Sequence, residues 1–127
     1  MEIRPINAAD APAAAASYSQ AVEVTGATRT LYISGQVGID DAGETPTDAV
    51  EQNRLVWSNL VAQLRAAGMT LDNLVRYTTI LTDIADLPAA RSVRAEFLGD
   101  RRPGSTLIVA GLAGAVWKVE IEGIAAA

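Results

Sequence analysis

The sequence predicts an α+β fold, in which two helices pack on one face of a mixed β-sheet. Two segments carry apolar residues at helical spacing, and the other apolar segments are short and rich in β-branched residues. Read in order, the segments give β, β, β, α, β, α, β, β. With 127 residues and no visible internal repeat, the chain is expected to form one domain over residues 1–127.

The N-terminal part is predicted to hold three strands. EIRPI, residues 2–6, is a short edge strand that ends at Pro5. AADAPAAAAS, residues 8–17, has no clear period and is expected to be an ordered surface loop. The apolar segments 18–24 and 29–39 flank a break that contains glycine, and this spacing predicts a β-hairpin.

Gly35 interrupts the second strand of that hairpin. A glycine inside a strand predicts a β-bulge or a place where a ligand approaches the backbone closely. Ser34, Gly35 and Gln36 are therefore candidates for a binding segment. The next turn is predicted at DDAGE, residues 40–44.

The first helix is expected to follow TPTD, residues 45–48. Thr45 can cap the helix, Pro46 suits the first helical position, and Asp48 completes a spacing like that of a capping box. Gly68 marks the end of the helix. One stripe at helical spacing is predicted to be core and consists of Val50, Trp57, Leu60, Leu64 and Ala67.

The C-terminal part is predicted to add three strands and one helix. Residues 75–83 alternate and are β-branched, which indicates a strand. The second helix begins at Pro88 and ends at Gly99. Residues 105–112 and 116–125 read as the two remaining strands, joined by a glycine-containing turn.

The charge and composition exclude several kinds of function. The chain has 10 Lys and Arg against 15 Asp and Glu and no dense basic run, which argues against nucleic-acid binding. It has no cysteine and no histidine, so thiol nucleophiles, thiolate metal sites and imidazole chemistry are absent. No apolar run is long enough for a membrane span and no secretory signal is visible, so a cytoplasmic location is expected.

Glu120 and Glu122 lie in a row with Lys118 on one face of the last predicted strand. One interpretation is an ordinary charged sheet surface, on which Lys118 eases the repulsion. The other is that one glutamate points into a cleft and acts as a general acid or base. The two carboxylates also suit a metal, but no third ligand is evident, and no metal site is predicted. Tyr18, at the start of a strand, is likewise either a packing residue or part of a site.

Several blocks carry a family resemblance when they are taken together in order. They are SYSQAV, LYISGQVGID, QNRLVWSNL, AAGMTLDNLVRYTTILTD, RPGSTLIVAGL and KVEIEGIA, which cover residues 18–125. This ordered set resembles the Rid family, also called YjgF or L-PSP. Its best-known members are deaminases of reactive enamine and imine intermediates.

The resemblance implies a chorismate-mutase-like fold and a homotrimer, in which three sheets form a barrel with a small-metabolite cleft at each subunit interface. It implies hydrolysis of 2-imino or 2-enamino acids without a cofactor. An arginine would bind the substrate carboxylate, and a glutamate would act on the attacking water. Carried over by position, the catalytic residue is Glu120, and the substrate-binding residues are Tyr18, Gly35, Gln36, Arg91, Gly104 and Thr106.

Gly104 stands where the resemblance places the carboxylate-binding arginine. An arginine fork is the best carboxylate clamp among side chains, so the chain is expected to have altered or weak activity unless Arg91, Arg101 or Arg102 reaches the cleft. A trimer that binds a small metabolite without turnover is the alternative. The ribonuclease activity sometimes ascribed to the L-PSP name is disfavoured by the acidic charge and the absence of histidine.

Overall fold

The computed structural model describes residues 1–15 and 17–127. Ala16, in the linker expected over residues 8–17, lies outside the described part. The elements are β1 (Glu2–Ile6), β2 (Ala21–Thr25), β3 (Thr30–Val37), α1 (Ala49–Ala66), η1 (Leu71–Asn73), β4 (Leu74–Leu81), η2 (Ile84–Asp86), α2 (Leu87–Leu98), β5 (Gly104–Val109) and β6 (Val119–Ala126). The predicted order of strands and helices is confirmed.

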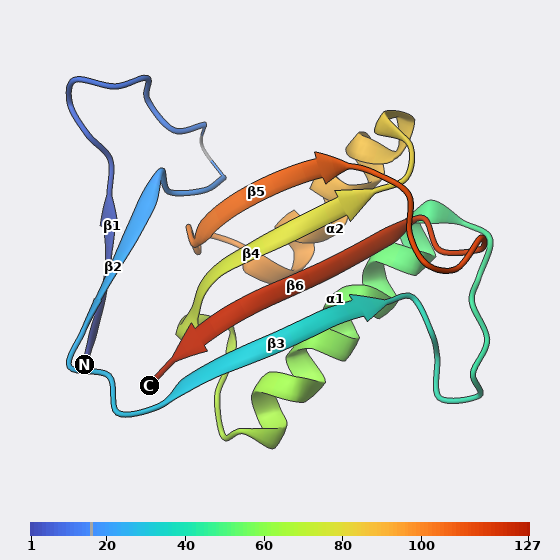
Figure 1. Ribbon diagram of the computed structural model, residues 1–127, viewed down its shortest axis with the longest axis horizontal. Coiled ribbons are helices and arrows are strands. Elements are labelled where there is room, and N and C mark those ends of the chain that lie inside the picture. The colour runs from blue at the N-terminus through green and yellow to red at the C-terminus, as the bar shows by residue number, and fades with distance from the viewer. Residues whose placement is uncertain (16) are drawn as a thin grey trace.

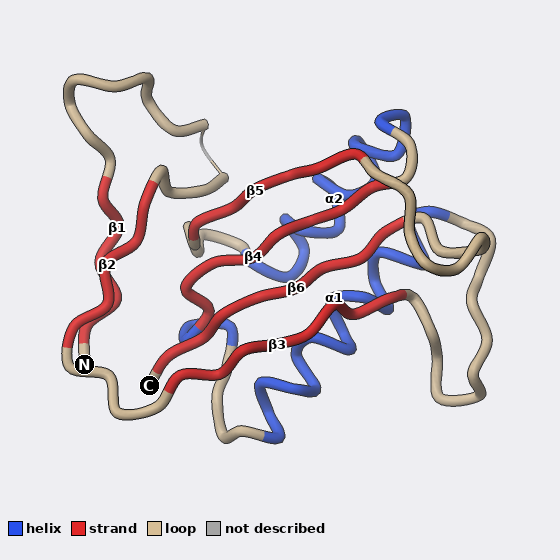
Figure 2. The backbone as a smooth tube through the Cα atoms, in the orientation of Figure 1, coloured by secondary structure: helices blue, strands red, loops and turns tan. Residues whose placement is uncertain are grey.

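A four-stranded sheet with the order β3-β6-β4-β5 forms the centre of the fold. The β4–β5 pair is parallel, and the pairs β3–β6 and β4–β6 are antiparallel, so the sheet is mixed as predicted. Both helices lie on the same face of this sheet (Figures 1 and 2). We call the opposite face, which carries Arg76, Thr106 and Glu120, the open face.

The predicted hairpin between residues 18–24 and 29–39 is wrong. β2 pairs with β1 in a separate two-stranded sheet, and β3 pairs with β6. A turn at Gly26, whose φ is 70°, directs the chain away from β2. The N–H groups of Thr28 and Arg29 then both donate to the carbonyl of Ala127. This places β3 beside the C-terminal strand. β1 also continues through Pro5 to Ile6 instead of ending at the proline.

The start of α1 was also predicted too early. Asp48 is the N-cap, and its side chain accepts a hydrogen bond from the Glu51 N–H. Pro46 stays outside the helix, where its carbonyl accepts a hydrogen bond from the buried Gln52 side chain. The same Gln52 amide donates to the Val116 carbonyl, so the segment before the helix is fixed by tertiary contacts and not by a Thr45 cap.

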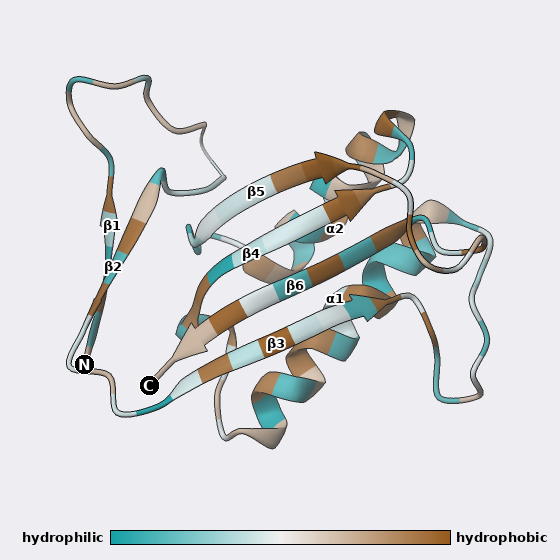
Figure 3. Ribbon diagram, in the orientation of Figure 1, coloured by the Kyte–Doolittle hydropathy of each residue, from teal (hydrophilic) through white to brown (hydrophobic). Residues whose placement is uncertain are grey.

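The core lies between the sheet and the two helices. Trp57, at its centre, is 1% exposed, packs edge-on against Tyr77 of β4 and stacks on Phe97 of α2. The predicted apolar stripe of α1 is confirmed, since Trp57, Leu60 and Leu64 are buried. Brown apolar residues alternate with polar ones along β6, while the C-terminal half of β5 is continuously apolar (Figure 3).

A forked ion pair joins the two helices on the surface. Arg54 of α1 donates to both carboxylate oxygens of Glu96 on α2, at 3.2 and 3.0 Å. Arg54 therefore lowers the pKa of the Glu96 carboxyl, chiefly through the hydrogen bond. It also bonds Glu51 one turn back on its own helix.

This pair should make stability depend on pH in acid. Because the pKa of Glu96 is lower in the folded state, its stabilising contribution is present above the ordinary carboxyl pKa and is lost as the pH falls through the folded-state pKa. Chemical denaturation as a function of pH is expected to show a shallower acid slope for Arg54→Gln than for the wild type. Arg65→Gln, which removes an exposed arginine of the same helix, is the control. Equal slopes in wild type and Arg54→Gln would contradict this assignment.

Candidate functional site

Polar side chains from β4, β5 and β6 form successive rows across the open face. Residues paired directly across strands put their side chains on the same face. One row holds Gly104, Arg76 and Ile124, and the next holds Thr106, Thr78 and Glu122. The third row ends in Glu120, which pairs with Ile80 of β4 and with Val37 of β3.

Glu120 lies against the backbone of Gly35. A β-bulge between Ile33 and Gln36 contains Gly35, as predicted from the glycine inside the strand. A Cβ atom built on Gly35 would lie 2.6 Å from Cδ and 2.8 Å from Oε2 of Glu120. Only glycine leaves the carboxylate in this position. Among the described residues, no side chain forms a hydrogen bond or ion pair with Glu120, so this carboxylate is available for a ligand or water.

The variant Gly35→Ala is expected to reduce any activity that depends on Glu120 while leaving the fold intact. The new methyl group must displace the end of a flexible side chain, not backbone. A misplacement of about 1 Å in a catalytic group costs on the order of 100-fold in rate. Gly111→Ala is the matched control, because nothing lies within 4 Å of its Cβ position. Turnover and melting temperature should be measured together, and a large loss of stability with unchanged turnover would contradict the prediction.

Two other predicted residues lie elsewhere. Gln36 pairs with the buried Ile121, so its side chain belongs to the helix-covered face, and its amide donates to the Ser34 carbonyl. Lys118 precedes β6, and its ammonium donates to the Thr47 carbonyl. The ammonium of Lys118 is therefore bonded to the segment before α1 and to neither glutamate.

Arg76 occupies the space beside Gly104. The two residues are directly paired, and a Cβ on Gly104 would lie 3.4 Å from Cβ of Arg76. The Arg76 guanidinium extends along the sheet, where Nη2 donates to Oγ1 of Thr106 at 3.1 Å. No carboxylate of the described chain lies within ion-pair distance of it. Arg76 thus brings an arginine to the face on which Glu120 lies.

The three arginines considered from the sequence do not reach Glu120. Arg101 pairs with Asp72 at 2.7 Å, and Arg102 donates to the carbonyls of Gly99 and Arg101. Arg91 lies on α2, on the other side of the sheet. Among the described strand residues, the pairing of β4 with β5 and β6 places Arg76 on the open face.

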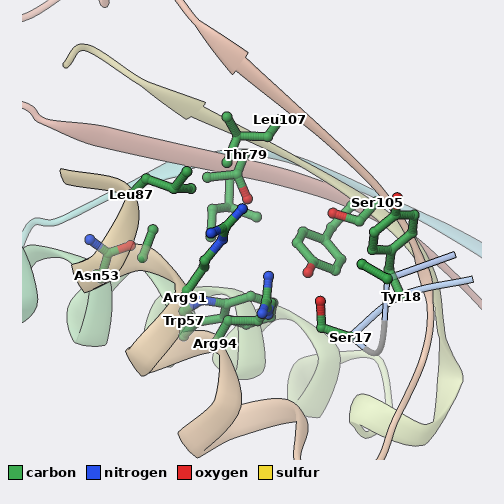
Figure 4. Close-up of a pocket in the computed structure, with 14 residues that line it drawn as sticks. Ser17, Tyr18, Asn53, Trp57, Thr79, Leu87, Arg91, Arg94, Ser105 and Leu107 are labelled. Atoms are coloured by element: carbon green, nitrogen blue, oxygen red, sulfur yellow. The ribbon is translucent and has the colours of Figure 1, made fainter. Parts of the chain in front are cut away.

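Tyr18 and Arg91 do come together, in a cavity on the helix side of the sheet (Figure 4). The cavity measures about 500 Å³ and lies between α2, β4, β5 and the segment around Tyr18. The sheet separates it from Glu120. Hence the predicted site residues divide into two groups, with Glu120, Gly35, Gly104 and Thr106 in one and Tyr18 and Arg91 in the other.

Sequence reasoning missed Arg76, and it also missed Arg94, Tyr77 and Asn53, which line the helix-side cavity. Arg76 stands in a segment correctly predicted to be a strand. Its importance depends on the parallel pairing of β4 with β5, which no local pattern indicates.

Among the described residues, no group of three or more acidic, histidine or cysteine side chains is placed to hold a metal ion. None of the described helices is both long and apolar enough to cross a membrane.

Comparisons with known proteins agree with the arrangement of strands and helices. Residues 8–127 match the family described as Endoribonuclease L-PSP. The chain belongs to the Rid (YjgF/L-PSP) family. It is 38% identical over 124 residues to the 2-iminobutanoate/2-iminopropanoate deaminase of Capra hircus, covering 96% of this chain and 88% of the relative. It is 40% identical over 112 residues to the mitochondrial protein mmf2 of Schizosaccharomyces pombe, covering 86% of each chain.

The fold is also that of a solved Rid-family structure. The protein YyfB of Yersinia pestis, of unknown function, superimposes with a TM-score of 0.86 at 32% identity, and all of both chains is covered. This likeness and the two helices on a mixed sheet confirm the α+β Rid fold predicted from the sequence. The family of this chain includes proteins named as imine deaminases.

Proposed function

We propose that the protein hydrolyses small 2-imino or 2-enamino acids on the open face of its sheet. The observation that carries the proposal is the unpaired Glu120 carboxylate against Gly35, with the Arg76 guanidinium on the same face. Residues two apart along a strand are separated by about 6.6 Å. The guanidinium at Thr106 therefore lies one row from Glu120 along the sheet, and because β4 lies between β5 and β6 it is also two strand spacings of about 4.8 Å away across the sheet.

In the proposed reaction, Arg76 binds the substrate carboxylate through charge-assisted hydrogen bonds, with Thr106 beside it. Glu120 accepts a proton from water as the water oxygen bonds to the imine carbon, and the C=N electron pair moves to nitrogen. The carbinolamine then takes the proton from Glu120 on nitrogen. Its hydroxyl proton then passes through Glu120 to the leaving nitrogen as the C–N bond breaks, which gives a 2-keto acid and ammonia. No step requires a cofactor.

We further propose a homotrimer in which neighbouring chains cover the free edges of the sheet. β3 and β5 are the two edge strands. Large apolar side chains are exposed on them, with Tyr32 at 75%, Ile108 at 44% and Val109 at 49% exposure. Exposed apolar edge strands are an aggregation hazard unless they are covered. Light scattering should give three times the 13.3 kDa chain mass, and a monomer at micromolar concentration would contradict this assembly.

The proposed activity is tested by keto-acid release from freshly generated imino acids. An amino-acid oxidase supplies a panel of 2-imino acids, and release is followed with and without this protein. Acceleration that saturates with substrate supports the proposal. No acceleration for any member of the panel would overturn it and would favour the alternative of a trimer that binds a metabolite without turnover.

A cytoplasmic location remains a proposal. One relative is named as mitochondrial, so fractionation of the source cells is the direct test.

A further inference from the structure

A small hollow lies on the open face, beside the proposed reaction site. It measures about 270 Å³ and lies over β3 and β6, next to Arg76 of β4. The side chains that matter for its chemistry are those of Tyr32, Ser34, Glu122 and Ile124. Pockets that hold a whole small molecule usually begin near about 300 Å³. The hollow is therefore sized for one substituent of a ligand whose remainder lies elsewhere on the face.

The strand register places the hollow next to Glu120. Glu120 and Glu122 are two residues apart on β6, so their side chains share the open face at a spacing of about 6.6 Å. Ile124 follows in the same row, and it pairs with Tyr32 of β3 on one side and with Arg76 of β4 on the other. A substrate whose imine carbon lies at Glu120 can thus extend its side chain along β6 into the hollow.

The hollow contains an unpaired negative charge. Glu122 is exposed, and its carboxylate forms no hydrogen bond or ion pair within the described chain. The one cation that lines the hollow, Arg76, donates from Nη2 to Oγ1 of Thr106 on β5. Because β4 lies between β5 and β6, this guanidinium is directed away from Glu122. In the proposed reaction its charge is also balanced by the substrate carboxylate, so the hollow favours a cationic group and repels an acidic one.

The other walls suit a cation at the end of an aliphatic chain. Tyr32 is 75% exposed, so its ring can accept a cation on its face. Ile124 provides apolar surface for methylene groups, and the Ser34 hydroxyl can accept an N–H bond. A guanidinium matches these walls well, because it binds a carboxylate through two parallel N–H groups and stacks on aromatic rings.

We propose that the hollow is the side-chain subsite of the reaction site and selects 2-imino acids whose side chain ends in a guanidinium or ammonium group. This inference rests on the proposed imine hydrolysis at Glu120. Glu122 determines specificity in it and does not take part in proton transfer.

The test compares the 2-imino acids of arginine and citrulline, which an amino-acid oxidase supplies from the parent amino acids. The two side chains are nearly equal in size, but only that of arginine is charged. We expect kcat/KM for keto-acid release to be about tenfold higher for the arginine compound, because the carboxylate pair and the stacking on Tyr32 act together. Turnover of both compounds with equal kcat/KM would overturn the subsite and leave the proposed function standing.

Variants assign the preference to the hollow through the ratio of the two kcat/KM values, which does not depend on the fraction of folded enzyme. Glu122→Gln should lower the ratio to about two, since only the contact with the ring remains. Tyr32→Leu should lower it about two- to fivefold. Glu2→Gln makes the same change of charge at an exposed residue of β1 and should keep the wild-type ratio. A ratio that Glu122→Gln leaves unchanged would overturn the proposal.

A binding measurement separates the subsite from the chemistry. Arginine and citrulline have no C=N bond at the α-carbon, and their binding is measured by calorimetry. Arginine should bind the wild type more tightly than citrulline, and Glu122→Gln should remove most of the difference. If no imino acid is hydrolysed, the proposed function fails, yet tighter binding of arginine still supports the cation subsite. If arginine also binds no better than citrulline, the subsite fails as well.

Discussion

Glu120→Gln is expected to lower kcat for imine hydrolysis by about 10²- to 10⁴-fold, the usual contribution of a positioned general acid–base group. The glutamine keeps the size of the side chain against Gly35, but it cannot take a proton from water. The measurement is keto-acid release at saturating imino acid. Circular dichroism of the variant establishes that the loss comes from chemistry and not from unfolding.

Glu122→Gln provides the comparison within the same strand. Glu122 also faces the open side of the sheet, one row from Glu120 and opposite Thr78. It lacks the contact with Gly35, so its replacement should cost much less. A larger loss in Glu122→Gln than in Glu120→Gln would transfer the proposed role to Glu122.

Arg76→Gln is expected to lower kcat/KM on the order of 100-fold, mainly by raising KM. Two charge-assisted hydrogen bonds to a carboxylate contribute about 3 kcal/mol at the low end of their range, and each 1.4 kcal/mol is about a factor of ten. Arg76→Lys should keep the charge but not the forked geometry, and its loss should be intermediate. Steady-state kinetics on one imino acid separates KM from kcat.

A double variant tests whether an arginine on β5 can replace Arg76 of β4. Gly104 is the direct cross-strand neighbour of Arg76, and a Cβ there meets only ordinary contacts. Adding Gly104→Arg to Arg76→Gln should recover much of the lost kcat/KM, because the guanidinium returns to the same face from β5. If the double variant is no better than Arg76→Gln while both remain folded, Arg76 does not act as the carboxylate clamp.

Much of the fold was predictable because its signals are local. The core stripe of α1, the glycine ends of both helices and the bulge at Gly35 each follow from a few adjacent residues. Strand pairing did not follow, since β2 and β3 are adjacent in the chain and yet belong to different sheets. The pairing partners of β2 and β3 depend on which apolar faces of the strands the helices cover. That arrangement depends on the whole chain and not on a few adjacent residues. That residues 1–127 form one domain stays a prediction.

The candidate site was predicted in part for the same reason. Glu120 and Gly35 were found from the strand pattern and from the family resemblance, and the structure brings them into contact. Gln36 and Lys118 were placed with them by sequence spacing, but a bulge and the late start of β6 turn them elsewhere. Arg76 was not predicted as a site residue, because only the β4–β5 register places it beside Gly104.

The position of β6 governs the order in which the protein can fold. β6 is the last strand in chain order, yet it lies between β3 and β4, and Thr30 is paired with Ala126. β4, α2 and β5 can assemble early because they are consecutive, whereas β3 must wait for the C-terminal strand. Such long-range pairing slows folding. During synthesis, the apolar helix-covered face of the sheet and α1 therefore remain exposed until nearly all of the chain has left the ribosome. A nascent chain of this kind is most prone to aggregate during this interval.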